Sequence, residues 1–204
     1  MRATTSQPSP SASVRVIVCL GKFSAPGLGL RTDGWETNMP PTRPMRVLFL
    51  CTGNACRSQM AEALTRHFGG ARVEAVSAGS NPAGFIHPLA VETMASMGIS
   101  LEGHWSKGWD EFADTELDIV LTLCDHAAGR PCPIWNGEPV QAHWGLSDPV
   151  GIIGSDAERL AYAADVAAAI KASIQELIKI DPRALSRDEV RRRLVAIAPV
   201  EPDA

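Results

Sequence analysis

A buried strand, a short loop and a helix follow one another without interruption in the first half of the chain. The strand is the apolar run Met45-Arg-Val-Leu-Phe-Leu50, and the helix begins at Ser58 and places its apolar residues on one face as far as Phe68. A strand that is apolar along nearly its whole length is typical of a parallel sheet covered on both faces. Parallel strands also need a crossover, which a helix usually supplies. This segment therefore predicts an α/β fold.

The chain that follows repeats the alternation of strands and helices. Besides the first strand at 46–50, the predicted strands span 72–77, 118–123 and 139–142. One helix is predicted from Pro88 to a stop at Gly98. Two more are predicted after Ser155 and Ser186, because each serine precedes a glutamate three positions later in a capping-box pattern. The fold class is therefore α/β, a three-layer αβα sandwich with a four-stranded parallel twisted sheet.

The two ends of the chain differ from this central part. Residues 1–44 are rich in Ser, Pro, Thr and Gly, with no acidic residue before Asp33. We predict a disordered N-terminal extension, because the apolar stretch 14–20 contains an arginine and makes a poor signal-peptide core. Pro and Gly also break the helix that an organelle transit peptide would need. Residues 45–180 form the predicted domain, and residues 181–204 are expected to be a C-terminal tail with a short helix.

Composition excludes several classes of protein. The 204 residues are 45% hydrophobic and 21% charged, with a net charge of −4, which is typical of a soluble globular protein. Basic and aromatic residues do not alternate along one face, and no run approaches the ~18 apolar residues of a membrane span. We therefore expect no nucleic-acid partner and no membrane association. Five cysteines without secretory features favour the cytoplasm and reactive thiols. We expect a monomer, and no role for Cys19.

The loop between the first strand and its helix has the chemistry of an oxyanion site. Gly53 and its small neighbours let backbone N–H groups turn inward around an anion, and the helix adds its positive N-terminal end. The same field favours a thiolate at Cys51. Arg57 offers a planar fork for two oxygens of a tetrahedral anion, and Ser58 is a hydrogen-bond donor for the sulfur. The residues expected to bind the anion are Thr52, Gly53, Asn54, Ala55, Cys56, Arg57 and Ser58.

Two further cysteines stand where they can meet Cys51. Cys124 follows a predicted strand, and parallel sheets gather groups at the carboxyl ends of their strands along one edge, where Cys51 also lies. Cys132 lies between two prolines in a polar stretch, which suits a loop that rearranges and carries a thiol outward. One alternative is that Cys124 is a core thiol. The other is a zinc site made of Cys124, His126, Cys132 and His143, although no C-x2-C pair is present.

The C-x5-R-S loop between a strand and a helix resembles that of the low-molecular-weight protein tyrosine phosphatase superfamily, and the resemblance runs from about residue 45 to about residue 180. Within that superfamily, the set Cys51, Cys124 and Cys132 resembles the thioredoxin-coupled arsenate reductases. The flanking segments agree with those reductases at Thr122-Leu123-Cys124, Cys132-Pro133, His143-Trp144-Gly145 and Asp148-Pro149. The gap between the last two cysteines differs slightly from the usual one, which leaves the path of that loop open.

The resemblance implies that arsenate is reduced to arsenite by successive thiol steps. Cys51 would attack arsenic while Asp148, as general acid, protonates the departing oxygen. Cys124 would then attack the Cys51 sulfur and release arsenite, and Cys132 would take over the disulfide. Thioredoxin, or a glutaredoxin with glutathione, would reduce that disulfide. The resemblance implies no metal and no organic cofactor.

Two other functions share the same loop. A phosphatase acting on phosphotyrosine or aryl phosphates would need Cys51, Arg57 and Asp148 alone. The separation of Asp148 from Cys51 in the sequence, however, resembles that in the reductases. The tyrosine phosphatases also tend to have tyrosines after the acid and around the substrate slot, whereas Tyr162 is the only tyrosine of this chain. An oxyanion or redox sensor would need an effector module, which the sequence does not display. Positions matching a potassium site of some reductases are Asn54, Glu62, Ser77 and Asp110, and ordinary hydrogen bonding explains each of them equally well.

Overall fold

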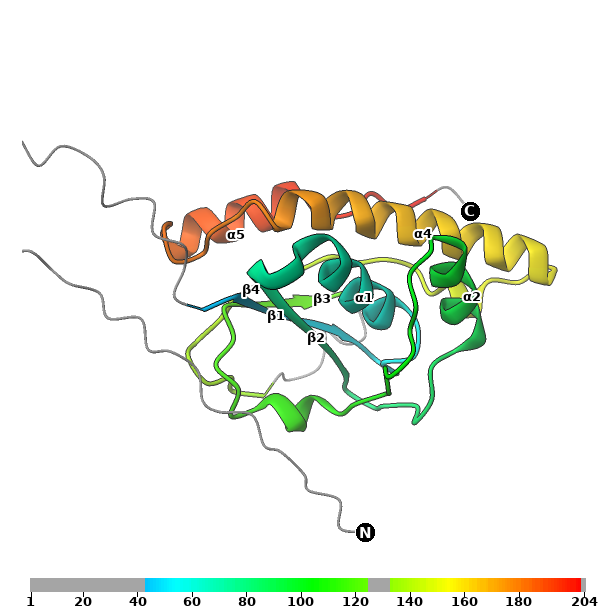
Figure 1. The fold of residues 1–204 in the computed structure, drawn as a ribbon, viewed down its shortest axis with the longest axis horizontal. Helices are drawn as coiled ribbons and strands as arrows, with labels where there is room; N and C mark the ends of the chain where they lie inside the picture. The colour runs from blue at the N-terminus through cyan, green and yellow to red at the C-terminus, as the bar shows by residue number, and fades with distance from the viewer. Residues whose placement is uncertain (1–42, 125–132, 203–204) are drawn as a thin grey trace, which may run out of the picture. The chain divides into compact units, whose positions relative to one another are not determined.

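A parallel sheet forms the centre of the fold. The computed structural model describes residues 43–124 and 133–202, which lie within one compact unit. The strands are β1 (Met45–Cys51), β2 (Val73–Gly79), β3 (Ile119–Thr122) and β4 (Val140–His143). They form a four-stranded sheet in the order β2-β1-β3-β4, in which every neighbouring pair is parallel (Figure 1). The sheet confirms the predicted fold class, and its strands lie within two residues of the predicted ranges.

The register aligns the carboxyl ends of the strands along one edge of the sheet. Cys51 pairs with Gly79 across β1 and β2, and Leu50 pairs with Thr122 across β1 and β3. Thr122 in turn pairs with His143 of β4. Groups that follow these strands therefore meet at one edge, as expected for a parallel α/β sheet.

The helices gather over one face of the sheet. They are α1 (Arg57–Gly69), α2 (Pro88–Ser96), α4 (Asp156–Leu177) and α5 (Arg187–Ala196), of which α1, α4 and α5 lie on the same side of the sheet in Figure 1. Successive side chains of β1 point to opposite faces of the sheet and pack in two separate hydrophobic cores. Val47 and Phe49 pack with the helices, whereas Leu48 and Leu50 pack on the opposite face. In the described part of the chain, that second core is covered by the short 3-10 turn Trp109–Phe112 and by Trp135.

The predicted capping signals are present at both C-terminal helices, but they differ in completeness. The Ser155 side chain accepts a hydrogen bond from the Glu158 amide, and the Glu158 carboxylate accepts one from the Ser155 amide at 2.8 Å, which completes a capping box. Ser186 also caps its helix, by accepting from the Glu189 amide. The Glu189 carboxylate, however, pairs with two arginines one turn further along the helix instead of returning to the cap. In this helix, ion pairs of Glu189 with Arg192 and Arg193 therefore take the place of its capping-box hydrogen bond to the Ser186 amide.

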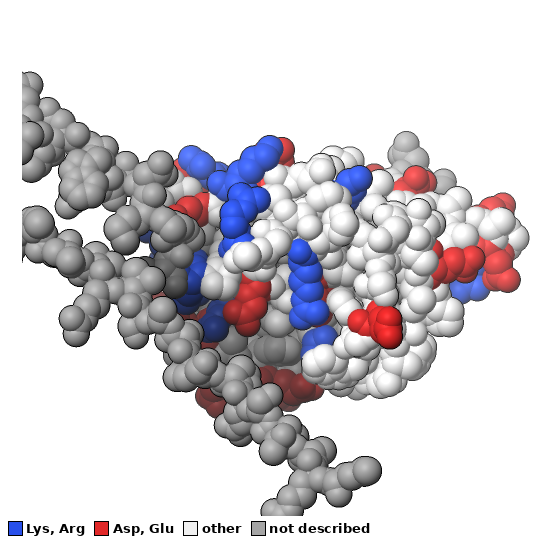
Figure 2. Space-filling model, viewed as in Figure 1, with Lys and Arg blue, Asp and Glu red and all other residues white. Residues whose placement is uncertain are grey.

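Helix α5 is part of the core. Val190 and Leu194 have no exposed surface, and the buried Trp144 indole donates a hydrogen bond of 2.9 Å to the Leu194 carbonyl. The opposite side of α5 presents its arginines to solvent, and Figure 2 shows basic side chains over this end of the molecule with acidic ones between them. Packing of its apolar stripe thus joins α5 to the sheet next to β4.

Some sequence predictions lie outside the residues that the structure describes. These are the predictions for residues 1–42, for His126 and for Cys132. Within 43–124 and 133–202, no helix has the length and apolar character that crossing a membrane requires.

The close approach between β2 and the loop after β1 generates a test of the fold. A Cβ atom at Gly79 would lie 2.6 Å from the Thr52 carbonyl oxygen and 3.0 Å from the Asn54 nitrogen, whereas one at Gly151 would meet nothing within 4 Å. We expect Gly79→Ala to lower the free energy of unfolding by about 2 kcal/mol through overpacking. Gly151→Ala, the matched control, should change it by less than about 0.5 kcal/mol. Urea unfolding measures both, and equal values for the two variants would contradict this packing.

Candidate active site

Cys51 ends β1 and begins a loop that surrounds its sulfur with hydrogen-bond donors. The side chain is almost fully buried, with 3% of its surface exposed. The Asn54 amide donates to Sγ at 3.2 Å, and the Ser58 hydroxyl lies 2.9 Å from the same sulfur. Helix α1 begins at Arg57, so its N-terminal end also points toward the loop. A negative charge on Cys51 is stabilised by this arrangement.

The side-chain amide of Asn54 orients these donors. Its Nδ2 atom donates to Ser58 Oγ at 2.9 Å and to Ser77 Oγ at 2.8 Å. Because Ser58 Oγ accepts from Asn54, its own hydrogen is directed toward Cys51. Asn54 adopts a positive φ of 46°, a conformation that asparagine tolerates better than most residues. One side chain therefore fixes both the shape of the loop and the donor to the sulfur.

The oxygen of the Asn54 side-chain amide also has two hydrogen-bond partners. Its Oδ1 atom accepts from the Lys107 backbone amide at 2.7 Å and from Gln59 Nε2 at 2.9 Å. Gln59 Nε2 also donates to the Asn54 carbonyl and to the Trp105 carbonyl. Neither Gln59 nor Lys107 was predicted from the sequence, since no local pattern marks a polar residue that braces a loop from another segment.

The loop carbonyls are bound from outside by residues that follow β2 and α2. The Gly53 carbonyl accepts from the Ala83 amide at 2.8 Å and from the Ser106 hydroxyl at 3.0 Å. The Ala55 carbonyl accepts from the His87 amide at 2.9 Å. With the carbonyls satisfied on the outer side, the loop amides face inward, which is the geometry of an anion-binding nest.

A buried charge network lies beneath the loop. The Ser77 hydroxyl donates to Glu62 Oε2 at 2.5 Å, and the Lys107 ammonium lies 3.2 Å from the same oxygen. Arg66 binds the second carboxylate oxygen at 2.6 Å. Glu62 is 1% exposed, and these two cations neutralise its charge. Three of the four positions considered for a potassium ion, Asn54, Glu62 and Ser77, belong to this network, whereas Asp110 is exposed.

Arg57 connects the loop to a distant segment. It is 7% exposed, and its NH1 atom donates to the Leu146 carbonyl at 2.6 Å. Its NH2 atom donates to Asp148 Oδ2 at 2.8 Å. The Nε atom is buried and has no acceptor among the described residues. Because an unpaired buried donor is costly, this N–H is suited to an anion in the loop.

Asp148 stands at the mouth of the site. Its side chain is 48% exposed, and the carboxylate also accepts from the Val150 amide, where it caps the 3-10 turn Pro149–Gly151. The second oxygen binds Arg57. The predicted acid is thus held beside the loop by an ion pair and a cap at once.

Two of the three predicted redox cysteines are brought together. Cys124 follows β3, is 6% exposed and packs against Cys51. Its sulfur lies 3.4 Å from Thr52 Oγ1. Both cysteines are in the reduced form, as is Cys56. Cys132 lies outside the described residues, so its position relative to this pair stays a prediction.

Cys56 differs from Cys51 although both belong to the loop. Burial, together with the charges of Asp148 and Cys51, raises the pKa of the Cys56 thiol to about 12, although the Arg57 charge acts in the opposite direction. Cys56 is therefore protonated at neutral pH and is not a nucleophile.

Among the residues that the structure describes, no three His, Cys, Asp or Glu side chains are close enough to share a metal ion.

A cavity of about 550 Å³ opens over the loop. The residues that line it come from the loop, from the end of β3, from the segment after β4 and from the C-terminus: Thr52, Arg57, Cys124, Gly145, Leu146, Ser147, Asp148 and Glu201. Sequence reasoning missed Glu201, because it follows α5 in a stretch without a motif.

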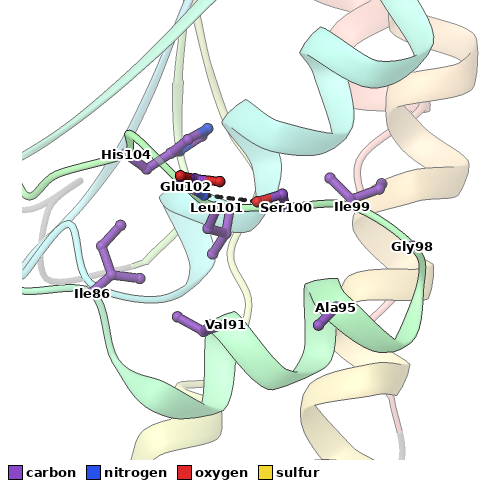
Figure 3. Close-up of a pocket in the computed structure, with 9 residues that line it drawn as sticks. All are labelled: Ile86, Val91, Ala95, Gly98, Ile99, Ser100, Leu101, Glu102 and His104. Atoms are coloured by element: carbon purple, nitrogen blue, oxygen red, sulfur yellow. Dashed lines mark hydrogen bonds between the residues drawn. The ribbon is translucent and has the colours of Figure 1, made fainter.

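A second cavity of about 660 Å³ lies elsewhere and is mainly apolar. Figure 3 shows Val91 and Ala95 of α2 facing it, opposite Ile99 and Leu101 of the segment that follows that helix. None of its lining residues is a cysteine. One of its polar lining residues is His104, whose Nδ1 atom donates to Gln59 Oε1 at 3.0 Å. Gln59 in turn binds Asn54 of the loop, so this cavity is connected to the loop through that side chain.

Comparison with known proteins agrees with the site. A family model described as low molecular weight phosphotyrosine protein phosphatase matches residues 46–191. An arsenate reductase of Halalkalibacterium halodurans is 39% identical over 115 residues, which cover 56% of this chain and 81% of that protein. These matches confirm the resemblance that the C-x5-R-S loop suggested.

Solved structures with the same fold include arsenate reductases. One, an arsenate reductase in the phosphate binding state, is 29% identical with a TM-score of 0.57, and the match covers 66% of this chain and 97% of that one. A thioredoxin-dependent arsenate reductase of Corynebacterium glutamicum is 31% identical with a TM-score of 0.51, over 68% of this chain and 62% of that one.

Loss of the Asn54 side chain is expected to destabilise the protein strongly. Asn54→Ala removes an amide that serves Ser58, Ser77, Gln59 and the Lys107 backbone, and leaves alanine at a positive φ. We expect the free energy of unfolding to fall by about 3 kcal/mol, which chemical denaturation measures.

The matched control for this substitution is an exposed asparagine. Within the described residues, the Asn136 side chain makes a single hydrogen bond, of 3.3 Å, to the Asp114 carbonyl. Asn136→Ala should cost less than about 0.5 kcal/mol. A loss of similar size at both positions would mean that Asn54 does not brace the loop.

The His104 side chain predicts a dependence of stability on pH. Burial lowers the pKa of His104, and the nearby Lys107 and Arg66 charges act in the same direction, while Glu62 opposes them. The unfolded chain therefore binds a proton, at about pH 6.5, before the folded one does. The free energy of unfolding should fall as the pH is lowered from about 7.5 to about 5.5.

The variant His104→Gln separates this effect from other titrations. Glutamine retains a donor for Gln59 but does not titrate. Denaturant unfolding at the two pH values should show a smaller decrease for His104→Gln than for the wild type. An identical decrease in both proteins would show that His104 does not carry the dependence.

Proposed function

The chain belongs to the low molecular weight phosphotyrosine protein phosphatase family, and on that basis we propose that it is an arsenate reductase whose electrons come from thioredoxin. The observation that carries this proposal is the pair of buried, reduced thiols of Cys51 and Cys124, which pack against each other beside the loop that follows β1. A phosphatase needs the first thiol alone. A second thiol in contact with it suits a disulfide relay.

Arsenate binds in the loop in the first step. The loop amides and Arg57 donate hydrogen bonds to its oxygens, and the unpaired Nε–H of Arg57 supports this role. Arg57 also holds Asp148, so an oxyanion in the loop competes with that carboxylate for the guanidinium. Substrate binding thereby weakens the Arg57–Asp148 ion pair and makes Asp148 available as the general acid.

Cys51 then forms a bond to arsenic. Its thiolate attacks, Asp148 protonates the departing oxygen, and water leaves, so that arsenic remains in oxidation state five with sulfur in place of one oxygen. Ser58 supports this step, because its hydroxyl lies 2.9 Å from the attacking sulfur. The remaining loop residues, Thr52, Gly53, Asn54, Ala55 and Cys56, hold the oxyanion through the backbone.

Reduction follows by thiol exchange. Cys124 attacks the Cys51 sulfur, the sulfur–arsenic bond breaks, and its electron pair reduces arsenic to arsenite. Cys132 attacks Cys124 next, which frees Cys51 and leaves a Cys124–Cys132 disulfide. A dithiol of thioredoxin, or of a glutaredoxin system, reduces this disulfide and restores all three thiols. The cycle balances without a metal or organic cofactor.

This chemistry also fits a reducing compartment. Three reduced cysteines in the described residues and a reductant of the thioredoxin type are typical of the cytoplasm, where we propose that the protein acts. The monomeric state and the lack of a nucleic-acid partner stay predictions from the sequence.

A second function shares the first attack. The family is described by phosphotyrosine phosphatase activity, and Cys51, Arg57 and Asp148 are sufficient for hydrolysis of an aryl phosphate. The two functions differ in whether Cys124 and Cys132 are needed.

Coupled turnover of arsenate with thioredoxin, thioredoxin reductase and NADPH distinguishes them. We expect Cys51→Ser to lose at least about a thousandfold in kcat in this assay and in para-nitrophenyl phosphate hydrolysis. Cys124→Ser should stop after the first adduct, and Cys132→Ser should stop at the Cys51–Cys124 disulfide. Neither variant should sustain NADPH consumption, while both still hydrolyse the aryl phosphate. Cys19→Ser, outside the family match, is the control and should behave as the wild type.

The opposite pattern would overturn the proposal. If the wild type consumes no NADPH with either thioredoxin or glutaredoxin but cleaves the aryl phosphate, the protein is a phosphatase. If Cys124→Ser and Cys132→Ser both sustain arsenate turnover, the relay through these two cysteines is wrong.

A further inference from the structure

The C-terminal segment returns to the catalytic cavity. After α5 the chain runs back beside α4, as the red segment in Figure 1 shows, and Glu201 lines the cavity together with Arg57, Cys124 and Asp148. Glu201 lies beyond residues 46–191, the range that the family model matches. The family's own description therefore assigns nothing to this residue.

Glu201 binds the segment that carries Asp148. Its Oε1 atom accepts a hydrogen bond of 2.7 Å from the Ser147 backbone amide. The same oxygen accepts one of 3.3 Å from the Tyr162 hydroxyl. Tyr162 is 7% exposed and belongs to α4, so one partner of Glu201 is anchored in the core and the other lies in the loop after β4.

Ser147 lies between the two residues that hold Arg57. The Leu146 carbonyl binds NH1 of the guanidinium and the Asp148 carboxylate binds NH2. A backbone amide fixed between these two contacts fixes both of them, because neighbouring residues share the peptide planes. The position of Arg57 over the anion loop thus depends on the conformation of residues 146–148.

We propose that Glu201 is a positioning residue, which ties residues 146–148 to Tyr162 of α4 and thereby holds Arg57 and Asp148 at the geometry that the first attack requires. This inference rests on the proposed function, since the attack on an oxyanion gives the geometry its purpose. A misplacement of reacting groups by about 1 Å costs about a hundredfold in rate, so a loop anchor has a measurable effect.

The negative charge of Glu201 weakens substrate binding, in contrast to the favourable effect of its hydrogen bonds on the geometry of the site. A carboxylate at the edge of an anion site repels an oxyanion, although its exposure to solvent screens that repulsion. Loss of the anchor therefore lowers kcat, while loss of the charge does not raise KM. This separation distinguishes a positioning residue from one that binds the substrate.

Tyr162 supplies a direct readout, because it is the only tyrosine in the chain. Burial raises the pKa of Tyr162, and the neighbouring Glu201 carboxylate raises it further, while a hydrogen bond with Ser147 and the Arg57 charge lower it. Ultraviolet titration of the phenol follows this pKa without any need for catalysis.

The experiment compares Glu201→Ala, Glu201→Gln and Asp165→Asn. Glutamine keeps an oxygen for the Ser147 amide but no charge, and alanine keeps neither. Asp165 is an exposed carboxylate on the same helix as Tyr162 and makes no hydrogen bond or ion pair within the described residues. We expect Glu201→Ala to lose about tenfold in kcat for arsenate with no rise in KM.

The other two variants complete the pattern. Glu201→Gln should stay within about threefold of the wild-type kcat, because the acceptor for the amide is retained. The pKa of Tyr162 should fall in both Glu201 variants, and Asp165→Asn should leave kcat and that pKa unchanged.

Two results would overturn this inference: a Glu201→Ala enzyme with wild-type kcat, or a Tyr162 pKa that neither Glu201 variant lowers. A higher KM at unchanged kcat would equally reject it, in favour of a direct binding role. Failure of the proposed function is a separate result. A wild type that turns over neither arsenate nor an aryl phosphate overturns that function, while the Tyr162 titration still reads the Glu201 contact.

Discussion

The site depends on the side chain of Asn54, which binds in four directions from a backbone at positive φ. Its amide group serves Ser58 and Ser77 on one side and the Lys107 backbone and Gln59 on the other. These bonds fix the shape of the loop and place the Ser58 hydroxyl 2.9 Å from the Cys51 sulfur. Strain at one residue is thus offset by a fully satisfied polar network, as is common at functional sites.

Charge in the site is arranged in two layers. Below the loop, the buried Glu62 carboxylate is neutralised by Lys107 and Arg66, so the loop rests on a network without excess charge. Above it, Arg57 and Asp148 form an ion pair at the mouth of the cavity. In the proposed mechanism, an incoming oxyanion displaces the half-exposed Asp148 carboxylate from the buried Arg57 and leaves the Glu62 network unchanged.

Much of the fold was predictable because its signals are local. The apolar run of β1, the capping serines and the glycine stop after α2 each specify an element through neighbouring residues. The two roles of β1 side chains also follow from alternation along one strand. The turn Trp109–Phe112, by contrast, carries no periodic signal, and its covering of the second core became clear only from packing. The exchange of the second capping box for arginine pairs was likewise decided by competition for one carboxylate.

The sequence by itself determined the reactive loop, since a nucleophile, small residues, an arginine and a helix start lie within eight consecutive positions, Cys51–Ser58. It also indicated Cys124, because residues after parallel strands meet at one edge, and Asp148, through the resemblance to the reductases. Tertiary structure decided which groups support them. Gln59, Lys107, Tyr162 and Glu201 are polar residues without a motif, and their hydrogen-bond partners lie as far as 54 residues away in the chain. Only folding brings such partners into contact, because a hydrogen bond specifies distance in space and not separation in sequence.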